Sequence, residues 1–184
     1  MAVTLNASTT AGLELTPDTS GVLNIQSGGS TKIAVTSAGV AVTGLSKASL
    51  PTGSVLQVVN YFPASSNGNT TSTTLTSTGL SATITPTSST SKIYVFAIVG
   101  VEIDPGAKMG STTIYRGSTN LAVSGTVMAA IRAQSGYIDA MIPMQVLDSP
   151  ATTSATTYTI YVKTDTSSTL FWFNSSITLM EIAA

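Results

Sequence analysis

The chain has 184 residues, of which only seven are Lys or Arg and eight are Asp or Glu, and it contains neither histidine nor cysteine. This composition excludes imidazole general acid–base catalysis, a thiol nucleophile and disulfide bonds, and it leaves only oxygen ligands for a metal ion. A hydrophobic fraction of 42% with a formal net charge of −1 is typical of a folded chain.

The distribution of charge and hydropathy also limits the partners of the chain. The seven basic residues are scattered singly, so we expect no nucleic-acid binding, which needs a basic stripe. The longest apolar run, 93–101, is too short for a membrane-spanning helix, and residues 1–6 lack a secretory signal. We therefore expect no membrane insertion. So few surface charges favour a homo-oligomer over a soluble monomer.

Residues 1–50 are predicted to form a short N-terminal β stem. Short apolar segments alternate with turn formers such as Thr16-Pro17-Asp18 and Ser27-Gly28-Gly29-Ser30. Strands this short bury only one thin face, so packing against copies of the same segment is the expected source of their stability. The expected strands are Leu13–Leu15, Val22–Ile25, Lys32–Val35 and Val40–Val42.

Residues 51–184 are predicted to form an antiparallel β-sandwich of the jelly-roll type. Apolar segments recur between turn signals, and Asn67-Gly68 is one such turn. Pro63, Pro86, Pro105 and Pro150 fall between strands, whereas Pro143 interrupts one and indicates an edge position or a bend. The expected strands are Ser54–Phe62, Leu80–Thr85, Ser91–Glu102, Ser111–Arg116, Thr126–Arg132, Tyr137–Leu147, Ala155–Lys163, Thr169–Phe173 and Ile177–Ile182.

Carboxylates are the first candidates for catalysis, because glycoside hydrolysis needs a facing pair of them. Glu102 and Asp104 would share one face at the end of a strand, but Asp104-Pro105-Gly106 is also a common turn sequence. We favour the turn for this segment, and likewise for Asp148-Ser149-Pro150. The remaining acidic candidates are Asp139 and Glu181.

Other catalytic and cofactor motifs are weak. Serine–lysine pairs occur at Ser91-Lys92 and Ser46-Lys47, and we interpret both as loop residues. Gly28-Gly29 lacks the Gly-Lys-Ser/Thr that completes a phosphate-binding loop. No acidic cluster has the spacing of a calcium loop. We therefore expect no catalytic residue, no metal site and no cofactor, and hence no enzyme.

Phe171-Trp172-Phe173 is the most distinctive local feature. On a strand Phe171 and Phe173 face one way and Trp172 the other. One side must be core, and the other is a subunit interface or, as an alternative, a sugar-stacking platform. In the second case, replacing Trp172 with Ala should abolish glycan binding.

Two parts of the chain resemble virion structural proteins of bacteriophages, especially marine and cyanobacterial phages. The opening is similar over Met1–Ala7 and Asp18–Ile25, and the C-terminal part resembles a domain of phage fibres. That second resemblance is carried by Thr83–Pro86, Ser91–Ile93, Tyr115–Leu121, Leu147–Tyr158 and Ile177–Ile182. It implies a trimeric, non-enzymatic virion component with an anchoring N-terminal segment and an exposed head.

The combined expectation is a short trimeric fibre, located on the virion and displayed for host-surface contact. The N-terminal segment would dock on other virion proteins of the capsid or tail, and a host glycan is a candidate partner. The first alternative is a capsid decoration (cement) protein that stabilises the phage head. The second alternative, of a different class, is a carbohydrate-binding module.

Overall fold

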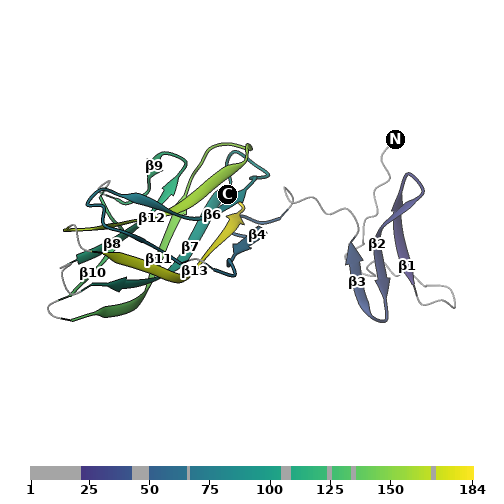
Figure 1. The fold of residues 1–184 in the computed structure, drawn as a ribbon. Helices are drawn as coiled ribbons and strands as arrows, with labels where there is room; N and C mark the ends of the chain where they lie inside the picture. The colour runs from purple at the N-terminus through teal and green to yellow at the C-terminus, as the bar shows by residue number, and fades with distance from the viewer. Residues whose placement is uncertain are drawn as a thin grey trace, which may run out of the picture. The chain divides into compact units, whose positions relative to one another are not determined.

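The computed structural model describes residues 22–42, 50–65, 67–104, 109–123, 126–133, 136–166 and 169–184, which form strands and no helix. The all-β prediction is therefore confirmed for these residues. The chain divides into two compact units, Met1–Ser49 and Leu50–Ala184 (Figure 1). The expected strand Leu13–Leu15 lies outside the described residues.

The N-terminal unit contains a three-stranded antiparallel sheet. Its strands β1 (Leu23–Ser27), β2 (Ser30–Thr36) and β3 (Gly39–Val42) follow one another in the order β1-β2-β3. Gly28 and Gly29 connect β1 to β2 with positive φ angles of 57° and 75°, which glycine adopts without steric cost. The Gly-Gly pair is thus a hairpin turn.

The register places all the larger aliphatic side chains of this small sheet on one face. Directly paired residues share a face, and every second residue along a strand returns to it. The two aliphatic rows are Leu23–Val35–Val40 and Ile25–Ile33–Val42, while Asn24–Ala34–Ala41 lies on the opposite face. Val40 and Val42 keep 66% and 50% of their surface exposed, so the aliphatic face is largely open in the single chain.

The C-terminal unit contains two five-stranded antiparallel sheets (Figure 1). The first, here called the β7–β13 sheet, has the order β11-β7-β13-β4, with β5 paired to β13. The second, the β8–β12 sheet, has the order β10-β8-β12-β6, with β9 paired to β8. The strands are β4 (Val55–Tyr61), β5 (Gly68–Thr70), β6 (Thr76–Ile84), β7 (Lys92–Ile103), β8 (Met109–Arg116), β9 (Thr119–Asn120), β10 (Ala129–Arg132), β11 (Ile138–Asp148), β12 (Thr156–Thr164) and β13 (Leu170–Ile182).

The order in which the chain visits the two sheets is that of a jelly roll. From β4 it passes to β6 in the other sheet, returns to β7, and crosses again to β8 and β10. It then returns for β11, crosses for β12 and ends in β13. Two interleaved Greek keys give this strand order, so the expected β-sandwich of the jelly-roll type is confirmed.

The core lies between the two sheets of the sandwich. In β7 every second side chain from Ile93 to Ile103 is buried, as the alternation of a strand requires. β12 and β13 contribute Tyr158, Ile160, Leu170 and Leu179 from the two sides. Each central strand therefore directs one set of side chains into the core and the other set to the outer surface.

The predicted interruption between Phe173 and Ile177 is a β-bulge within one continuous strand. The register of β13 against β7 shifts between Phe173 and Ser176, and Asn174 takes a φ of 44°. The bulge brings Phe173 directly onto Gly100 of β7: a Cβ atom built on Gly100 would lie 2.3 Å from the Phe173 carbonyl oxygen. The expectation of two separate strands here was wrong.

Two further local predictions have different outcomes. Pro143 lies in β11, the edge strand of its sheet, where a missing N–H costs no ladder bond on the open side; the edge position is confirmed. The prediction of a turn at Asn67-Gly68 was wrong, because Gly68 begins the short strand β5 and pairs with Trp172. The small strand β9 was not expected.

Gly100→Ala should destabilise the sandwich by more than about 2 kcal/mol, since the clash is with backbone and an aromatic ring. Thermal or urea unfolding of the full chain measures this. The control is Ser81→Ala, which removes one oxygen atom from a partly exposed residue of β6. Its free energy of unfolding should stay within about 0.5 kcal/mol of that of the unmodified protein. Equal stability of the two variants would contradict the bulge packing.

Candidate functional site

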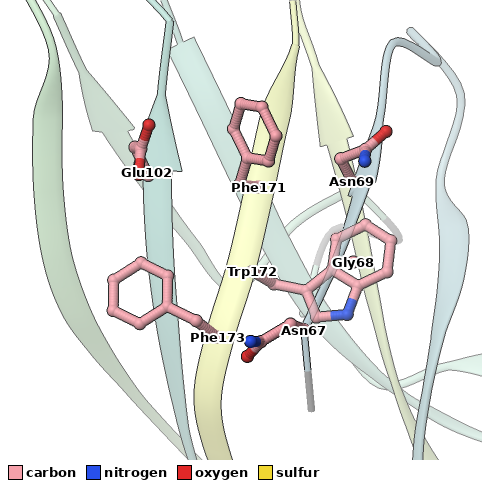
Figure 2. A pocket seen from close by; sticks show the side chains of 7 residues that line it. All are labelled: Asn67, Gly68, Asn69, Glu102, Phe171, Trp172 and Phe173. Carbon is pink, nitrogen blue, oxygen red and sulfur yellow. The ribbon is translucent and has the colours of Figure 1, made fainter. Parts of the chain in front are cut away.

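A pocket of about 500 Å³ opens on the outer face of the β7–β13 sheet, where β5 joins β13. Figure 2 shows Glu102, Phe171 and Asn69 in a row across the sheet, with Phe173 and Asn67 beside them. These side chains come from three strands or their ends: β7, β13 and β5. The lining residues are Asn67, Gly68, Asn69, Glu102, Phe171, Trp172 and Phe173.

Trp172 forms the floor of this region and belongs to the core. It is only 8% exposed, and its indole ring packs against Gly68, where a Cβ atom would lie 2.3 Å from the ring. The pairing of Trp172 with Gly68 thus depends on the missing side chain of glycine. Phe171 and Phe173 point to the outer face (Figure 2). Trp172 is thus on the core side of the Phe171-Trp172-Phe173 segment, and the alternative of a sugar-stacking platform stays a prediction.

The register brings two candidate carboxylates together on the outer face. Glu102 pairs with Phe171 on one side and with Asp139 of the edge strand β11 on the other. Directly opposite residues have Cβ atoms about 5 Å apart. Asp104, the carboxylate considered as a catalytic partner of Glu102, follows the end of β7, and its N–H donates to the Thr169 carbonyl at 3.2 Å. The structure therefore places Asp139, and not Asp104, directly across from Glu102.

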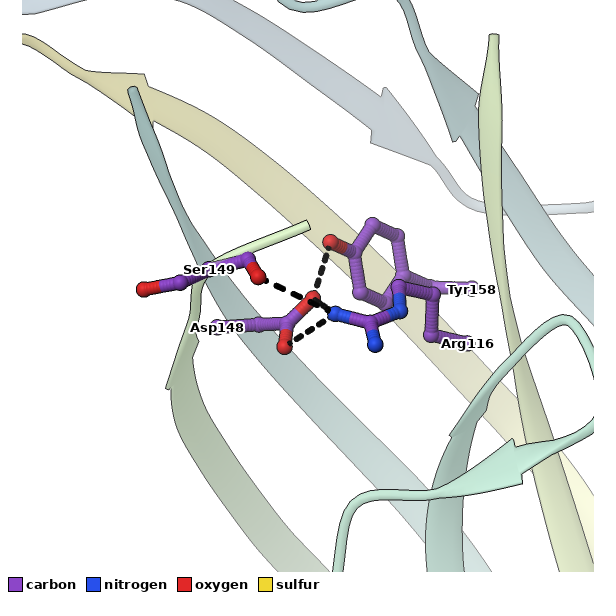
Figure 3. Close-up of polar contacts among 4 residues, drawn as sticks. All are labelled: Arg116, Asp148, Ser149 and Tyr158. Carbon is purple, nitrogen blue, oxygen red and sulfur yellow. Dashed lines mark hydrogen bonds and ion pairs between the residues drawn. The ribbon is translucent and has the colours of Figure 1, made fainter. Parts of the chain in front are cut away.

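Asp148 lies in a polar cluster that closes one end of the sandwich (Figure 3). Arg116 donates to both carboxylate oxygens at 2.7 and 2.8 Å and to the Ser149 carbonyl at 3.4 Å. The Tyr158 hydroxyl donates to Asp148 at 2.7 Å. Burial, reinforced by this bond to the carboxylate, raises the pKa of Tyr158 far above its ordinary value.

This cluster joins the two ends of the segment Leu147–Tyr158, which connects β11 to β12. Asp148 ends β11 and Tyr158 lies in β12, so their hydrogen bond clamps the connection between the two sheets. Ala151 within the connection has a φ of 53°, a conformation that a non-glycine residue adopts only when its surroundings hold it there. Asp148 thus serves the fold, with two partners that satisfy its charge.

Glu181 is fully buried near the C-terminal end of β13. It accepts hydrogen bonds from the Thr87 N–H at 2.6 Å, the Thr87 hydroxyl at 2.7 Å and the Gln57 amide at 2.6 Å. Burial disfavours the charged carboxylate, but the hydrogen bonds from Thr87 and Gln57 outweigh it, so the pKa of Glu181 is lowered. The carboxylate therefore joins the β6–β7 connection to β4 and β13.

The Ser-Lys motifs and the remaining acidic residues form no metal-binding cluster in the part of the chain that the structure describes. Ser91 is buried just before β7, whereas the neighbouring Lys92 is exposed. Ser46-Lys47 lies outside the described residues. Across the described ranges, no three His, Cys, Asp or Glu side chains gather as metal ligands. The same ranges contain no helix long and apolar enough to cross a membrane.

Comparison with known proteins adds no relative. No protein-family model matches the chain, and no curated protein is significantly similar to it.

Asp148→Ala should cost about 2–4 kcal/mol, because it leaves the Arg116 guanidinium and the buried Tyr158 hydroxyl without their acceptor. Denaturant unfolding of the full chain gives the value. The control is Asp139→Asn, a change at an exposed carboxylate. A loss below about 0.5 kcal/mol for Asp148→Ala would show that the cluster does not hold the sandwich together.

Glu181→Gln should make the free energy of unfolding depend less on pH in the acid range. A carboxyl with a lowered folded-state pKa adds stability above its unfolded value of about 4.3, and this stability is lost as pH falls through the folded-state pKa. At neutral pH the glutamine variant should be less stable by roughly 1–2 kcal/mol. Unfolding curves at several pH values measure both effects, and parallel pH profiles of the two proteins would contradict the assignment.

Proposed function

We propose that the chain is a non-enzymatic bacteriophage virion surface protein that assembles as a short trimeric fibre and is displayed for host-surface contact. The observation that carries the proposal is the pair of outward-facing apolar β surfaces, one in each compact unit. Such surfaces are stable in water when another protein surface covers them. Identical copies of the chain supply that cover.

The first surface is the aliphatic face of the β1-β2-β3 sheet. Its two rows, Leu23–Val35–Val40 and Ile25–Ile33–Val42, contain no polar side chain. A sheet of three short strands needs a hydrophobic face packed against something to be stable. Equivalent faces from several copies would form a closed apolar core along a common axis, which is the architecture of a β stem.

The second surface lies on the outer face of the β7–β13 sheet, toward the end where β4 begins. The register aligns one row of residues across β11, β7, β13 and β4: Leu147, Tyr94, Met180 and Val58. Leu147 and Val58 keep 53% and 55% of their surface exposed. This row, here called the head contact row, is continuous and uncharged. It would pack the heads of neighbouring copies against one another.

The outer face of the β8–β12 sheet differs in chemistry. Thr83 and Thr157 share a hydrogen bond of 2.8 Å across β6 and β12. Tyr115 and Tyr161 stack with ring centroids 4.1 Å apart, and Lys163 lies farther along β12. These hydroxyl and ammonium groups are compatible with water. In an assembly held by the head contact row, this polar face would point outward.

The resemblance to phage fibre domains supports three as the number of copies and the virion as the location. Arg116, Asp148 and Tyr158, which lie in the stretches that carry the resemblance, are joined by hydrogen bonds in the sandwich. A capsid decoration protein is the second candidate. Electron microscopy of labelled virions separates the two: binding over the whole shell indicates decoration, and binding at the tail or at isolated points indicates a fibre.

Val40→Asp should disrupt the assembly, whereas Ala41→Asp should leave it intact. The two residues are neighbours on β3 and both are exposed in the single chain, but only Val40 belongs to the aliphatic face. An aspartate buried between copies costs several kcal/mol of desolvation. Light scattering of the full-length variants gives their masses. Equal masses for the two variants, at the mass of the unmodified protein, would contradict assembly through this face.

A further inference from the structure

We infer that the pocket at Phe171 binds a neutral saccharide unit. This inference rests on the proposed function and deepens it, because it names the ligand class through which the head would contact the host surface. The pocket brings together two outward-facing aromatic rings, one carboxylate and two primary amides (Figure 2). The functional assignment above uses none of these five side chains.

The aromatic part is suited to the C–H faces of a sugar ring. Phe171 and Phe173 are two residues apart on β13 and extend from the same side of the strand (Figure 2). Both rings are partly exposed. The negative face of an aromatic ring attracts weakly positive C–H groups, so a pyranose lying over these rings would bury its apolar face.

The polar part is suited to hydroxyl groups. Glu102 and Asn69 flank Phe171 across the sheet, and Asn67 lies beside Phe173. A carboxylate accepts hydrogen bonds, while an amide both donates and accepts them. Adjacent hydroxyls of a sugar present donors and acceptors in the same way. Hydrogen bonds to the charged Glu102 would be the strongest of the set.

Charge and shape favour a neutral sugar over other ligands. Glu102 and the neighbouring Asp139 place negative charge at the site, which disfavours sialylated or sulfated glycans. An organic ammonium ion is usually bound in a cage of aromatic faces. Here the two rings extend from one strand on an open sheet surface, so they form a platform rather than a cage.

The position of the pocket leaves it accessible in the proposed assembly. It lies at the Leu170–Phe173 end of β13, whereas the head contact row crosses β13 at Met180. About seven to ten residues of extended strand separate the two, or roughly 23–33 Å. The chain enters the head near Val55, which pairs with Ile182. The pocket is thus at the far end of the sheet from the entry of the chain.

The test is titration of the full-length protein with neutral oligosaccharides ending in glucose, galactose, mannose or N-acetylglucosamine, followed by NMR or calorimetry. Sialyllactose and tetramethylammonium are the comparison ligands. Phe171→Ala and Glu102→Gln should each weaken binding of the preferred oligosaccharide at least tenfold. Phe171→Tyr, which keeps the ring, should retain binding. Phe62→Ala is the matched control, because Phe62 is an exposed phenylalanine outside the pocket.

Three outcomes would overturn the inference: binding of none of the neutral oligosaccharides, preferred binding of sialyllactose or tetramethylammonium, or equal effects of Phe171→Ala and Phe62→Ala. Light scattering on the same samples separates this failure from failure of the proposed function. If Phe171→Ala lowers the mass of the assembly, the pocket face is a contact between copies and the saccharide inference is wrong. If the unmodified protein is monomeric, the proposed fibre is wrong even where sugars bind.

Discussion

The alternation of side chains along β7 and β13, in a chain with almost no charge, is the constraint on which the rest of the structure depends. Each strand sends every second side chain into the core. In a more highly charged chain the remaining, outward-facing positions would carry charged side chains. Here several of them carry large side chains, such as Tyr94, Phe96, Phe171 and Met180, so that the outer face of the same sheet has apolar regions beside polar residues such as Glu102 and Thr178. One pattern thus produces both the folded core and a surface suited to association.

The bulge in β13 divides this outer face into two parts with different register against β7. On the C-terminal side of the bulge, where β13 pairs with β4, the register forms the continuous head contact row. Before it, Phe173 is held on Gly100 and Phe171 lies between Glu102 and Asn69. A regular strand would continue a single register across the sheet, whereas the bulge changes it at the border of the pocket. Packing of the Phe173 backbone against Gly100 therefore separates the region proposed for assembly from the region proposed for recognition.

Much of the fold could be predicted from the sequence because its signals are local. The apolar run 93–101 predicted the central strand β7. Pro143 indicated an edge position or a bend in β11, and the structure has the edge position. The bulge could not be predicted, since Asn174-Ser175-Ser176 has the composition of a loop and only pairing with β7 holds it in a strand. The composition of Asn67-Gly68 likewise favoured a turn, whereas pairing with Trp172 makes Gly68 part of β5.

Only part of the candidate site could be predicted, because pairing between strands distant in sequence decides the rest. Alternation along Phe171-Trp172-Phe173 predicted that one side of the strand faces the core and the other faces outward. Alternation alone does not say whether the core side is that of Trp172 or that of the two phenylalanines. Gly68, distant in sequence, decides it by leaving room for the indole. The neighbours Glu102, Asp139 and Asn69 depend on the register of four strands, which no local pattern specifies.

The central claim is that the apolar faces of this chain are covered by identical copies. Native mass spectrometry of the unmodified full-length protein, repeated over a dilution series, tests it most directly. The account predicts one species at three times the chain mass of 18.7 kDa, persisting on dilution. A stable species at the mass of a single chain at every concentration would contradict it.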